Sequence, residues 1–135
     1  MDDSILFFFG KHPGALPIYE RFEQRLMDSV SDFYRKVQAT QISFYNRHMF
    51  ACVSFSRIRP KRECPPSFII VTFGLAHRVS SPRIDVVIEP YPNRWTHHVL
   101  ISDPNEVDGE LMGWIKEAAF FQRQNSPGCR ILYQH

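Results

Sequence analysis

The chain has 135 residues, of which 44% are hydrophobic and 22% charged, and its formal net charge is +2. These values are typical of a soluble globular protein and predict a single domain over residues 1–135. The longest uncharged apolar run, residues 5–10, is far shorter than the roughly 20 residues of a membrane span, and aspartates precede it. We therefore expect no signal peptide, no membrane-spanning helix and no membrane partner.

The cysteines bear on the cellular compartment. There are three, Cys52, Cys64 and Cys129, with no close pair among them. A disulfide framework uses an even number of cysteines, so this pattern favours a reducing environment. We expect a cytoplasmic protein.

Charge is distributed unevenly along the chain. Residues 1–34 carry 3 basic and 6 acidic groups, whereas residues 35–94 carry 10 basic and 3 acidic groups. Residues 95–135 return to an acidic excess, with 3 basic and 5 acidic groups. A basic middle segment therefore lies between two acidic ends.

The predicted elements begin with a helix over residues 13–31, where apolar side chains recur at helical spacing. Pro17 falls near its first turn, where proline is best tolerated. The period then changes to short segments rich in aromatic and β-branched residues, separated by turn-forming residues: 33–39, 41–45, 49–55, 67–75, 83–89 and 95–101. The connections are too short for helical crossovers, so the pattern predicts an antiparallel β-meander of about five strands.

A second helix is predicted within residues 102–124. Asp103 suits its cap, Pro104 its first position, and Glu106 completes a capping-box pattern. The sequence NSPG ends this helix, and residues 129–135 are expected to form a tail. The order of elements predicts an α+β fold in which the N-terminal and C-terminal helices flank the sheet.

The segments 49–55 and 67–75 are apolar on both faces, whereas a strand of a half-solvated sheet alternates. Either these strands are central and covered twice, for example by a curved sheet, or the second face meets a partner such as the other copy of a homodimer. In the segment before them, Gln41, Ser43 and Tyr45 share one face, which suits either a groove or a solvated edge strand.

Four blocks of the sequence resemble a known family: TQISFYNRHMFACVSF, FIIVTFGL, SPRIDVVIEPYPNRWTHHVLIS and ELMGWIKEA. At this spacing they are similar to a bacterial family of domains of unknown function, family 5655, and the resemblance covers nearly the whole chain. Some members of that family are appended to predicted transport proteins. The resemblance implies a bacterial cytosolic protein and carries no defined activity, cofactor or functional residue.

The adjacent histidines His97 and His98 are the first candidates for a functional site. Neighbouring residues of a strand point to opposite faces, so the two imidazoles do not act together. If residues 91–94 form the hairpin loop, Ile88 lies opposite His97. Ile84 and Val86 then share a face with Ile88, and this face is a core face. We interpret His97 as a buried histidine with a hydrogen-bonding partner; the alternative is a pocket histidine.

On the other face, the same hairpin places Glu89 within reach of His98. A nearby carboxylate would raise the pKa of His98 and suit general acid–base chemistry, whereas an ordinary surface pair explains the same juxtaposition. No nucleophile or oxyanion arrangement accompanies the pair, so we expect no catalytic residue. The cysteines lack zinc-site spacing and the two histidines diverge, so we expect no metal and no cofactor.

Residues 56–66, SRIRPKRECPP, form a basic loop. Such a run is usually a solvated loop. In a meander, however, successive turns alternate between the two ends of the sheet. This alternation places the basic loop at the same end as the 91–94 turn. We therefore predict one ligand-binding end made of these residues: Arg57, Arg59, Arg62, Glu89, Tyr91, Arg94, Trp95 and His98.

Arginines beside exposed aromatic side chains suit phosphate or carboxylate recognition. The sequence therefore favours a noncatalytic binding or interaction module for an anionic small molecule or protein partner. One alternative is a nucleic-acid-binding domain, which a pI of about 8.5 and the absence of a standard motif support only weakly. The other is a small enzyme that uses Glu89, His98 and Arg94.

Overall fold

The computed structural model describes residues 3–124. Its helices are α1 (Asp3–Phe8), α2 (Leu16–Ser29) and α3 (Gly109–Gln124), and its 3₁₀ turns are η1 (Pro13–Ala15), η2 (Lys61–Glu63) and η3 (Pro104–Glu106). Its strands are β1 (Tyr34–Val37), β2 (Gln41–Tyr45), β3 (Met49–Ser54), β4 (Ile69–Leu75), β5 (Ile84–Tyr91) and β6 (Arg94–Ile101). Over these residues, none of the helices has the length and apolar character needed to cross a membrane. The predicted tail, 129–135, lies outside the described residues.

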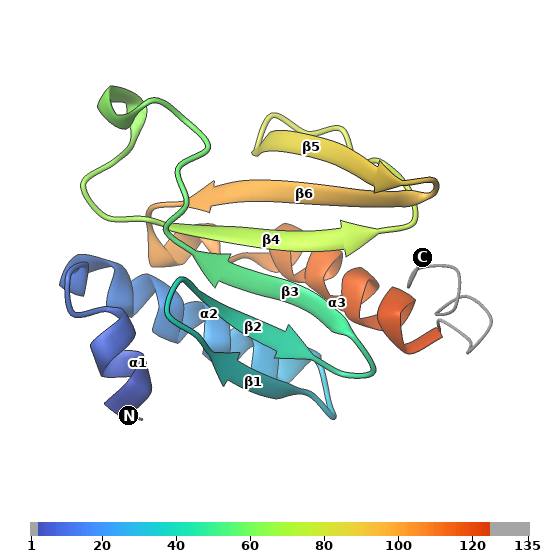
Figure 1. Ribbon diagram of the computed structural model, residues 1–135, viewed down its shortest axis with the longest axis horizontal. Helices are drawn as coiled ribbons and strands as arrows, with labels where there is room; N and C mark the ends of the chain where they lie inside the picture. The colour runs from blue at the N-terminus through green and yellow to red at the C-terminus, as the bar shows by residue number, and fades with distance from the viewer. Residues whose placement is uncertain (1–2, 125–135) are drawn as a thin grey trace.

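The strands form one antiparallel sheet in the order β1-β2-β3-β4-β6-β5 (Figure 1). The α+β class and the antiparallel sheet are confirmed, with six strands instead of about five. The meander is wrong at one point: β4 and β5 both pair with β6, so they run in the same direction on either side of it. Residues 76–83 therefore return along β6 instead of making a hairpin. Eight extended residues reach at most ~28 Å, which is enough to run back along a seven-residue strand.

The returning segment is fastened to the helical side of the sheet. The backbone N–H of Val79 donates to Nε2 of His97 at 3.0 Å. Arg83 binds Asp108 at 2.8 and 3.1 Å, Glu110 at 3.0 Å and the carbonyl oxygen of Glu106 at 2.7 Å. Residues 76–83 thus cover β6 on the face that α3 occupies.

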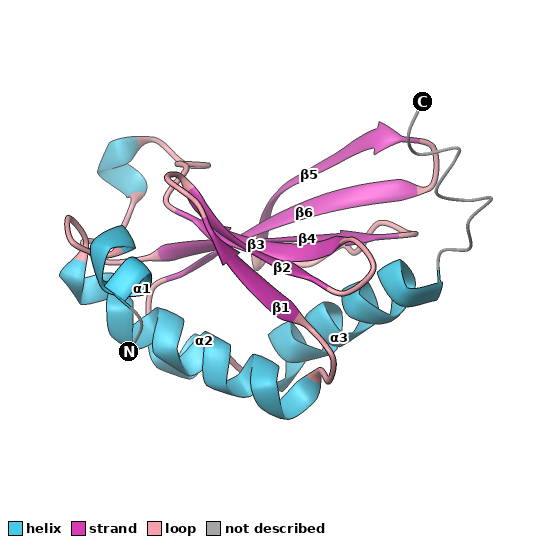
Figure 2. Cartoon of the chain, turned by 60° about the horizontal axis from the view of Figure 1, so that its bottom comes forward, coloured by secondary structure: helices cyan, strands magenta, loops and turns pink. Residues whose placement is uncertain are grey.

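The core lies between the sheet and the helices, which all pack on one face (Figure 2). Phe73 is stacked between His97, at 5.0 Å between ring centroids, and Trp114, at 5.8 Å. His97 is fully buried, as predicted, and faces α3. On the other strand of that hairpin, Val87 and not Ile88 pairs with His97, and Ile88 is 50% exposed.

The second face of the sheet, which we call the open face, is not packed against any α-helix of residues 3–124 (Figure 2). Ile70 and Leu100 are nevertheless buried on it, at 1% and 8% exposure. The chain leaving β3 crosses the ends of β4 and β6 on this face before it returns to β4 (Figure 1). The doubly apolar strands are therefore central strands whose second face is partly covered by a loop of the same chain. The strand 41–45 is internal and not an edge strand, because β1 lies outside it.

Local signals explain where the helices begin. Asp103 accepts from the N–H of Asn105 at 2.8 Å, which caps η3 and not a long helix. Asp108 accepts from the N–H of Leu111 at 3.0 Å and caps α3. The predicted second helix is therefore divided into a 3₁₀ turn and α3. Helix α1, in the apolar run near the start of the chain, was not predicted.

Candidate functional site

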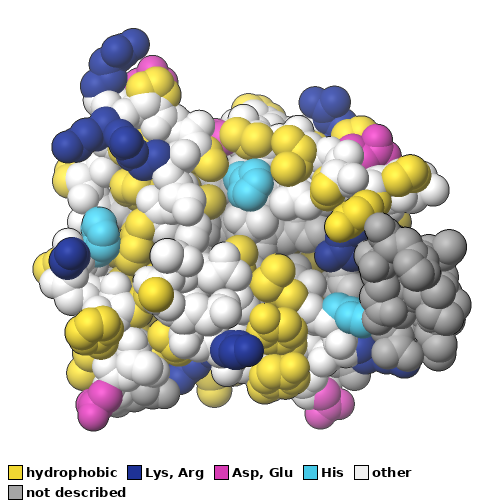
Figure 3. Space-filling view, in the orientation of Figure 1, with side chains coloured by type: hydrophobic (Ala, Val, Ile, Leu, Met, Phe, Trp, Pro, Cys, Tyr) yellow, Lys and Arg dark blue, Asp and Glu magenta, His cyan; other side chains and the backbone are white. Residues whose placement is uncertain are grey.

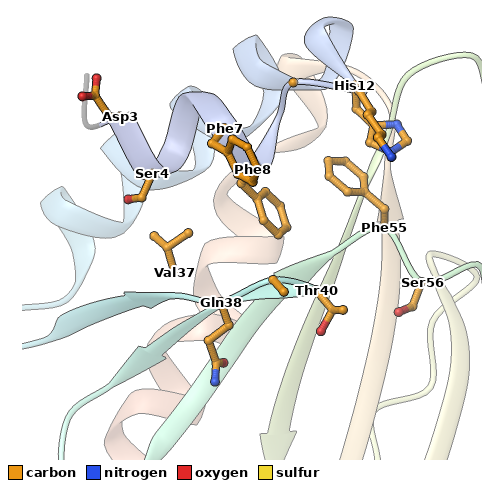
Figure 4. Close-up of a pocket in the computed structure, with 13 residues that line it drawn as sticks. Asp3, Ser4, Phe7, Phe8, His12, Val37, Gln38, Thr40, Phe55 and Ser56 are labelled. Carbon is orange, nitrogen blue, oxygen red and sulfur yellow. The ribbon is translucent and has the colours of Figure 1, made fainter.

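The described residues enclose a groove of about 1080 Å³ between α1 and the turn that joins β1 to β2 (Figure 4). We call it the α1 groove. Its lining is mostly apolar and comes from three parts of the chain: Asp3, Ser4, Phe7, Phe8, Gly10, Lys11, His12, Val37, Gln38, Ala39, Thr40, Phe55 and Ser56. Concave apolar sites of this size with few polar groups are where proteins bind small molecules.

One side of the groove is set by the short helix α1. Ile5 and Phe9, four residues apart, share a helix face and are buried in the core, at 0% and 2% exposure. This anchoring turns the intervening residues outward: Phe8 is half-buried against the core and Phe7 is 89% exposed. Gly10 ends α1, and a Cβ there would lie 3.2 Å from the carbonyl oxygen of Phe7. The groove therefore has an aromatic side that contributes little to the core.

The wall at the other end is organised around Phe55, which follows β3. Its ring stacks on His12 at 4.0 Å between centroids and on Phe8 at 5.3 Å. It also meets Phe9 edge-on at 5.4 Å. These contacts hold the imidazole of His12 at the rim (Figure 4). Parallel rings at such distances form a continuous apolar surface with a polar edge.

The polar groups of the groove are segregated by charge. Asp3 and Ser4 lie at one end, and His12 and Ser56 at the other (Figure 4). Lys11 precedes His12 and also lines the groove, and Arg57 follows Ser56 on the basic loop. One end thus carries a carboxylate, and the other carries the imidazole of His12, which Lys11 precedes in the chain, next to an aromatic wall.

The predicted ligand-binding residues do not form one cluster. On the basic loop, Arg57 and Arg62 are exposed, whereas Arg59 is bound to Asp85 at 2.5 and 3.2 Å. Arg59 therefore fastens the loop to β5. Of the three arginines, Arg57 lies closest in sequence to the α1 groove.

The 91–94 turn lies at the opposite end of the sheet from the basic loop, because β4 ends where β6 begins. The predicted juxtaposition of these two segments is wrong, and its cause is the return of residues 76–83 along β6. Tyr91 is 46% exposed, and Arg94 lies over the ring of Phe121 at 5.9 Å. Trp95 is half-buried on the helical side, with Arg78 over its ring at 6.0 Å.

The predicted pair of Glu89 and His98 does not form. Tyr91 pairs with Arg94, so the loop is shorter than the four residues expected, and a bulge between Ile88 and Tyr91 shifts the register beyond it by one residue. Pro90 lies in this bulge and has no N–H to give to the ladder. Val86 consequently pairs with His98. Glu89 is exposed and accepts from the N–H of Asn93 at 3.1 Å.

His98 lies on the open face, as predicted, in a row with Cys52 and Thr72. Nδ1 of His98 and the hydroxyl of Thr72 are 2.8 Å apart. Burial lowers the pKa of His98. Burial also raises the pKa of the Cys52 thiol, although the hydrogen bond between Cys52 and Thr72 lowers it in part. Both groups are therefore held neutral, which is the opposite of the thiolate and imidazolium of an activated nucleophile.

A metal site does not emerge from the described part of the chain, which contains no group of three histidine, cysteine or carboxylate side chains arranged to hold an ion. Cys52 and Cys64 are free thiols, the first buried and the second half-buried. The chemistry that the α1 groove offers is therefore recognition by apolar contact and charge.

The sequence signal that could have revealed the groove is the run of Phe7, Phe8 and Phe9 before Gly10. Three successive aromatic residues on a helix cannot all face one core, because helical neighbours are rotated by about 100°. At least one ring therefore had to remain outside the core. What the sequence could not supply was the neighbour, since Phe55 lies far along the chain.

The family assignment agrees with the expected resemblance. Residues 7–121 match the family described as Domain of unknown function (DUF5655). The chain belongs to this family. No curated protein and no solved structure matches the chain. The matched residues include Phe7, Phe8 and Phe55 of the groove, but not Asp3 and Ser4 at its acidic end.

Proposed function

We propose that this member of the family is a noncatalytic binding module for a small amphipathic anion. The observation that carries the proposal is the α1 groove, a mostly apolar concavity of about 1080 Å³ with an aromatic wall that includes the Phe55–His12 stack, and with Lys11 in its lining. An alkyl or aryl group would lie along Phe7, Phe8 and Val37. Its carboxylate or phosphate would lie near Lys11 and Arg57.

Burial of the apolar part supplies most of the affinity, and the charged end sets the orientation. Asp3, at the far end, repels an anion and so opposes the reversed orientation. The neutral His98 and Cys52 of the open face support a binding role in place of the enzyme alternative. The free thiols of Cys52 and Cys64 support a cytoplasmic location.

The test measures thermal unfolding and calorimetric binding with three probes of one chain length: an alkyl carboxylate, the matching alcohol and the matching trimethylammonium compound. We expect the carboxylate to bind most tightly and the ammonium compound least tightly. At about 100 times its dissociation constant, the carboxylate should stabilise the fold by about 2.7 kcal/mol.

Two variants test whether the probes bind in the α1 groove. Phe7→Ser should weaken all three probes, because the Phe7 ring is 89% exposed and contributes to the groove more than to the fold. Phe120→Ser is its matched control, since Phe120 is 62% exposed on α3. Lys11→Gln should weaken the carboxylate and leave the alcohol unchanged, with Lys116→Gln as control. Absence of binding by every probe, or equal losses in Phe7→Ser and Phe120→Ser, would refute the proposal.

A further inference from the structure

The open face of the sheet carries a second set of features that the α1 groove does not use. The groove lies on the helical side, whereas Tyr34, Lys36 and Tyr45 lie on the open face. Their orientation follows from their neighbours: Ile42 and Phe44 of β2 are buried in the core, so the alternate residues point the other way.

Two tyrosines form an aromatic platform on this face. Tyr34 and Tyr45 are paired across β1 and β2, and their rings stack at 5.2 Å with an angle of 9° between planes. Tyr34 is 59% exposed. Met49, which pairs with Tyr45, is 38% exposed and continues the apolar strip. Packing into the core therefore does not explain why the rings of Tyr34 and Tyr45 are stacked.

Cationic side chains flank the platform. Lys36 is exposed on the same face of β1, two residues beyond Tyr34. Arg47 is exposed in the turn between β2 and β3, two residues beyond Tyr45. Each of these exposed cationic residues is therefore two positions along the chain from a tyrosine of the platform.

The two layers of the molecule also differ in charge. Residues 35–94, with 10 basic and 3 acidic groups, contain most of β1, all of β2 to β5 and the loops between them. Two of these basic residues, Arg35 and Arg83, form ion pairs with Glu23 and Asp108 on the helical side. Helices α2 and α3 are nearly balanced, with five acidic residues, Glu20, Glu23, Asp28, Glu110 and Glu117, and four basic ones, Arg21, Arg25, Lys116 and Arg123. Seen from the open face, lysine and arginine side chains outnumber acidic ones (Figure 3). Such an asymmetry orients a polyanion towards the sheet.

We propose that the open face binds single-stranded nucleic acid, with a base stacked on the Tyr34–Tyr45 platform and neighbouring phosphates on Lys36 and Arg47. Unpaired bases stack on aromatic rings of any sheet-face platform, and cations beside the rings follow the backbone. A duplex has no free base face to stack. A second copy of this face would bring Lys36 and Arg47 against their own counterparts, which is electrostatically unfavourable.

The experiment measures fluorescence anisotropy of the full chain with a labelled, unstructured oligothymidine or oligouridine at several salt concentrations. We expect saturable binding with a negative salt slope of about 0.7 per phosphate contact. Tyr34→Ala should weaken binding on the order of ten-fold, whereas Tyr34→Phe should retain it, because the ring is what stacks. Lys36→Gln should reduce the salt slope by about 0.7.

Matched controls are Tyr91→Ala, which removes a tyrosine 46% exposed in the β5–β6 hairpin, and Lys116→Gln on α3. Both should bind like the wild type, and thermal melts check that every variant folds. The proposal is overturned if no oligonucleotide binds at low salt or if duplex binds as well as single strand. It is also overturned if Tyr34→Ala loses no more than Tyr91→Ala, or if the face is covered by a second copy in a dimer that the oligonucleotide does not disturb. A failed α1-groove experiment leaves these outcomes unaffected, because the two sites share no residue.

Discussion

Arg59 and Asp85 form a two-bond ion pair that joins the basic loop to β5, from Nε to Oδ2 at 2.5 Å and from Nη2 to Oδ1 at 3.2 Å. Their side chains are 35% and 15% exposed, so water screens the pair only in part. The parallel geometry of the two bonds adds direction to the charge attraction. The pair holds the loop across the sheet, where Ile70 and Leu100 are buried without a covering helix.

Loss of this pair should release the loop. Asp85→Asn keeps every lysine and arginine of residues 56–66, so its tryptic sites are those of the wild type. We expect limited trypsinolysis to cut this loop several times faster in Asp85→Asn, with a loss of stability of about 1 kcal/mol. Asp28→Asn, which removes an exposed carboxylate of α2, is the control. Equal cleavage rates in the two variants would show that the pair does not hold the loop.

His97 should make the fold less stable in acid. Its Nε2 accepts from the N–H of Val79, and burial lowers its pKa in the folded state. The unfolded chain therefore takes up a proton near the ordinary pKa of about 6.5 while the folded chain does not, and stability falls as pH falls below that value. This loss approaches about 1.4 kcal/mol per pH unit for one group. Urea titrations between pH 5 and 8 should show that the free energy of unfolding falls less steeply with decreasing pH in His97→Gln than in the wild type. The variant should keep part of the pH dependence, because burial lowers the pKa of His98 as well.

The ion pair of His77 and Glu117 should act in the opposite direction. The hydrogen bond that the His77 imidazolium donates to the Glu117 carboxylate raises the pKa of His77, and this effect is larger than the opposing effect of partial burial. Its contribution is therefore complete below the ordinary value of about 6.5 and is lost as pH rises through the raised folded-state pKa. The side chains are 55% and 46% exposed, so we expect only about 0.5 kcal/mol. The wild type should be more stable than Glu117→Gln at pH 6 and equally stable at pH 8.5. If the stability difference is the same at both pH values, protonation of His77 is not the cause of the difference.

The strands were predictable because their signals are local. Short aromatic and β-branched segments lie in all six strands, and Pro and Asn residues mark the turns. Strand order is different, because nothing local in residues 76–83 distinguishes a hairpin from a return along β6. That choice rests on non-local contacts, such as Val79 with His97 and Arg83 with Asp108. The one-residue register error had a local cause in Pro90, since a proline inside a ladder signals a bulge.

The candidate site was less predictable than the fold. Sequence analysis identified the basic loop, in which Arg57 directly follows the groove residue Ser56, but Tyr91, Arg94 and Trp95 lie at the other end of the sheet. The placement of those residues depended on the meander, so one topological error separated three of the eight expected residues from the basic loop. The groove itself depends on Phe8 meeting Phe55, and no spacing along the chain encodes such a long-range contact.

Gly14 of η1 packs against Ser67, just after the basic loop, and a side chain at position 14 should destabilise the fold. A Cβ there would lie 2.2 Å from Oγ and 3.2 Å from Cβ of Ser67. Gly14→Ala should therefore lower the free energy of unfolding by about 1–3 kcal/mol, as overpacking does. Ser67→Ala removes the closer atom and should restore part of this loss in the double variant, while it changes stability little by itself. The check is a double-mutant cycle by urea unfolding. A coupling energy near zero would mean that the backbone moves to accept the methyl group, and that this contact does not hold η1 against the loop.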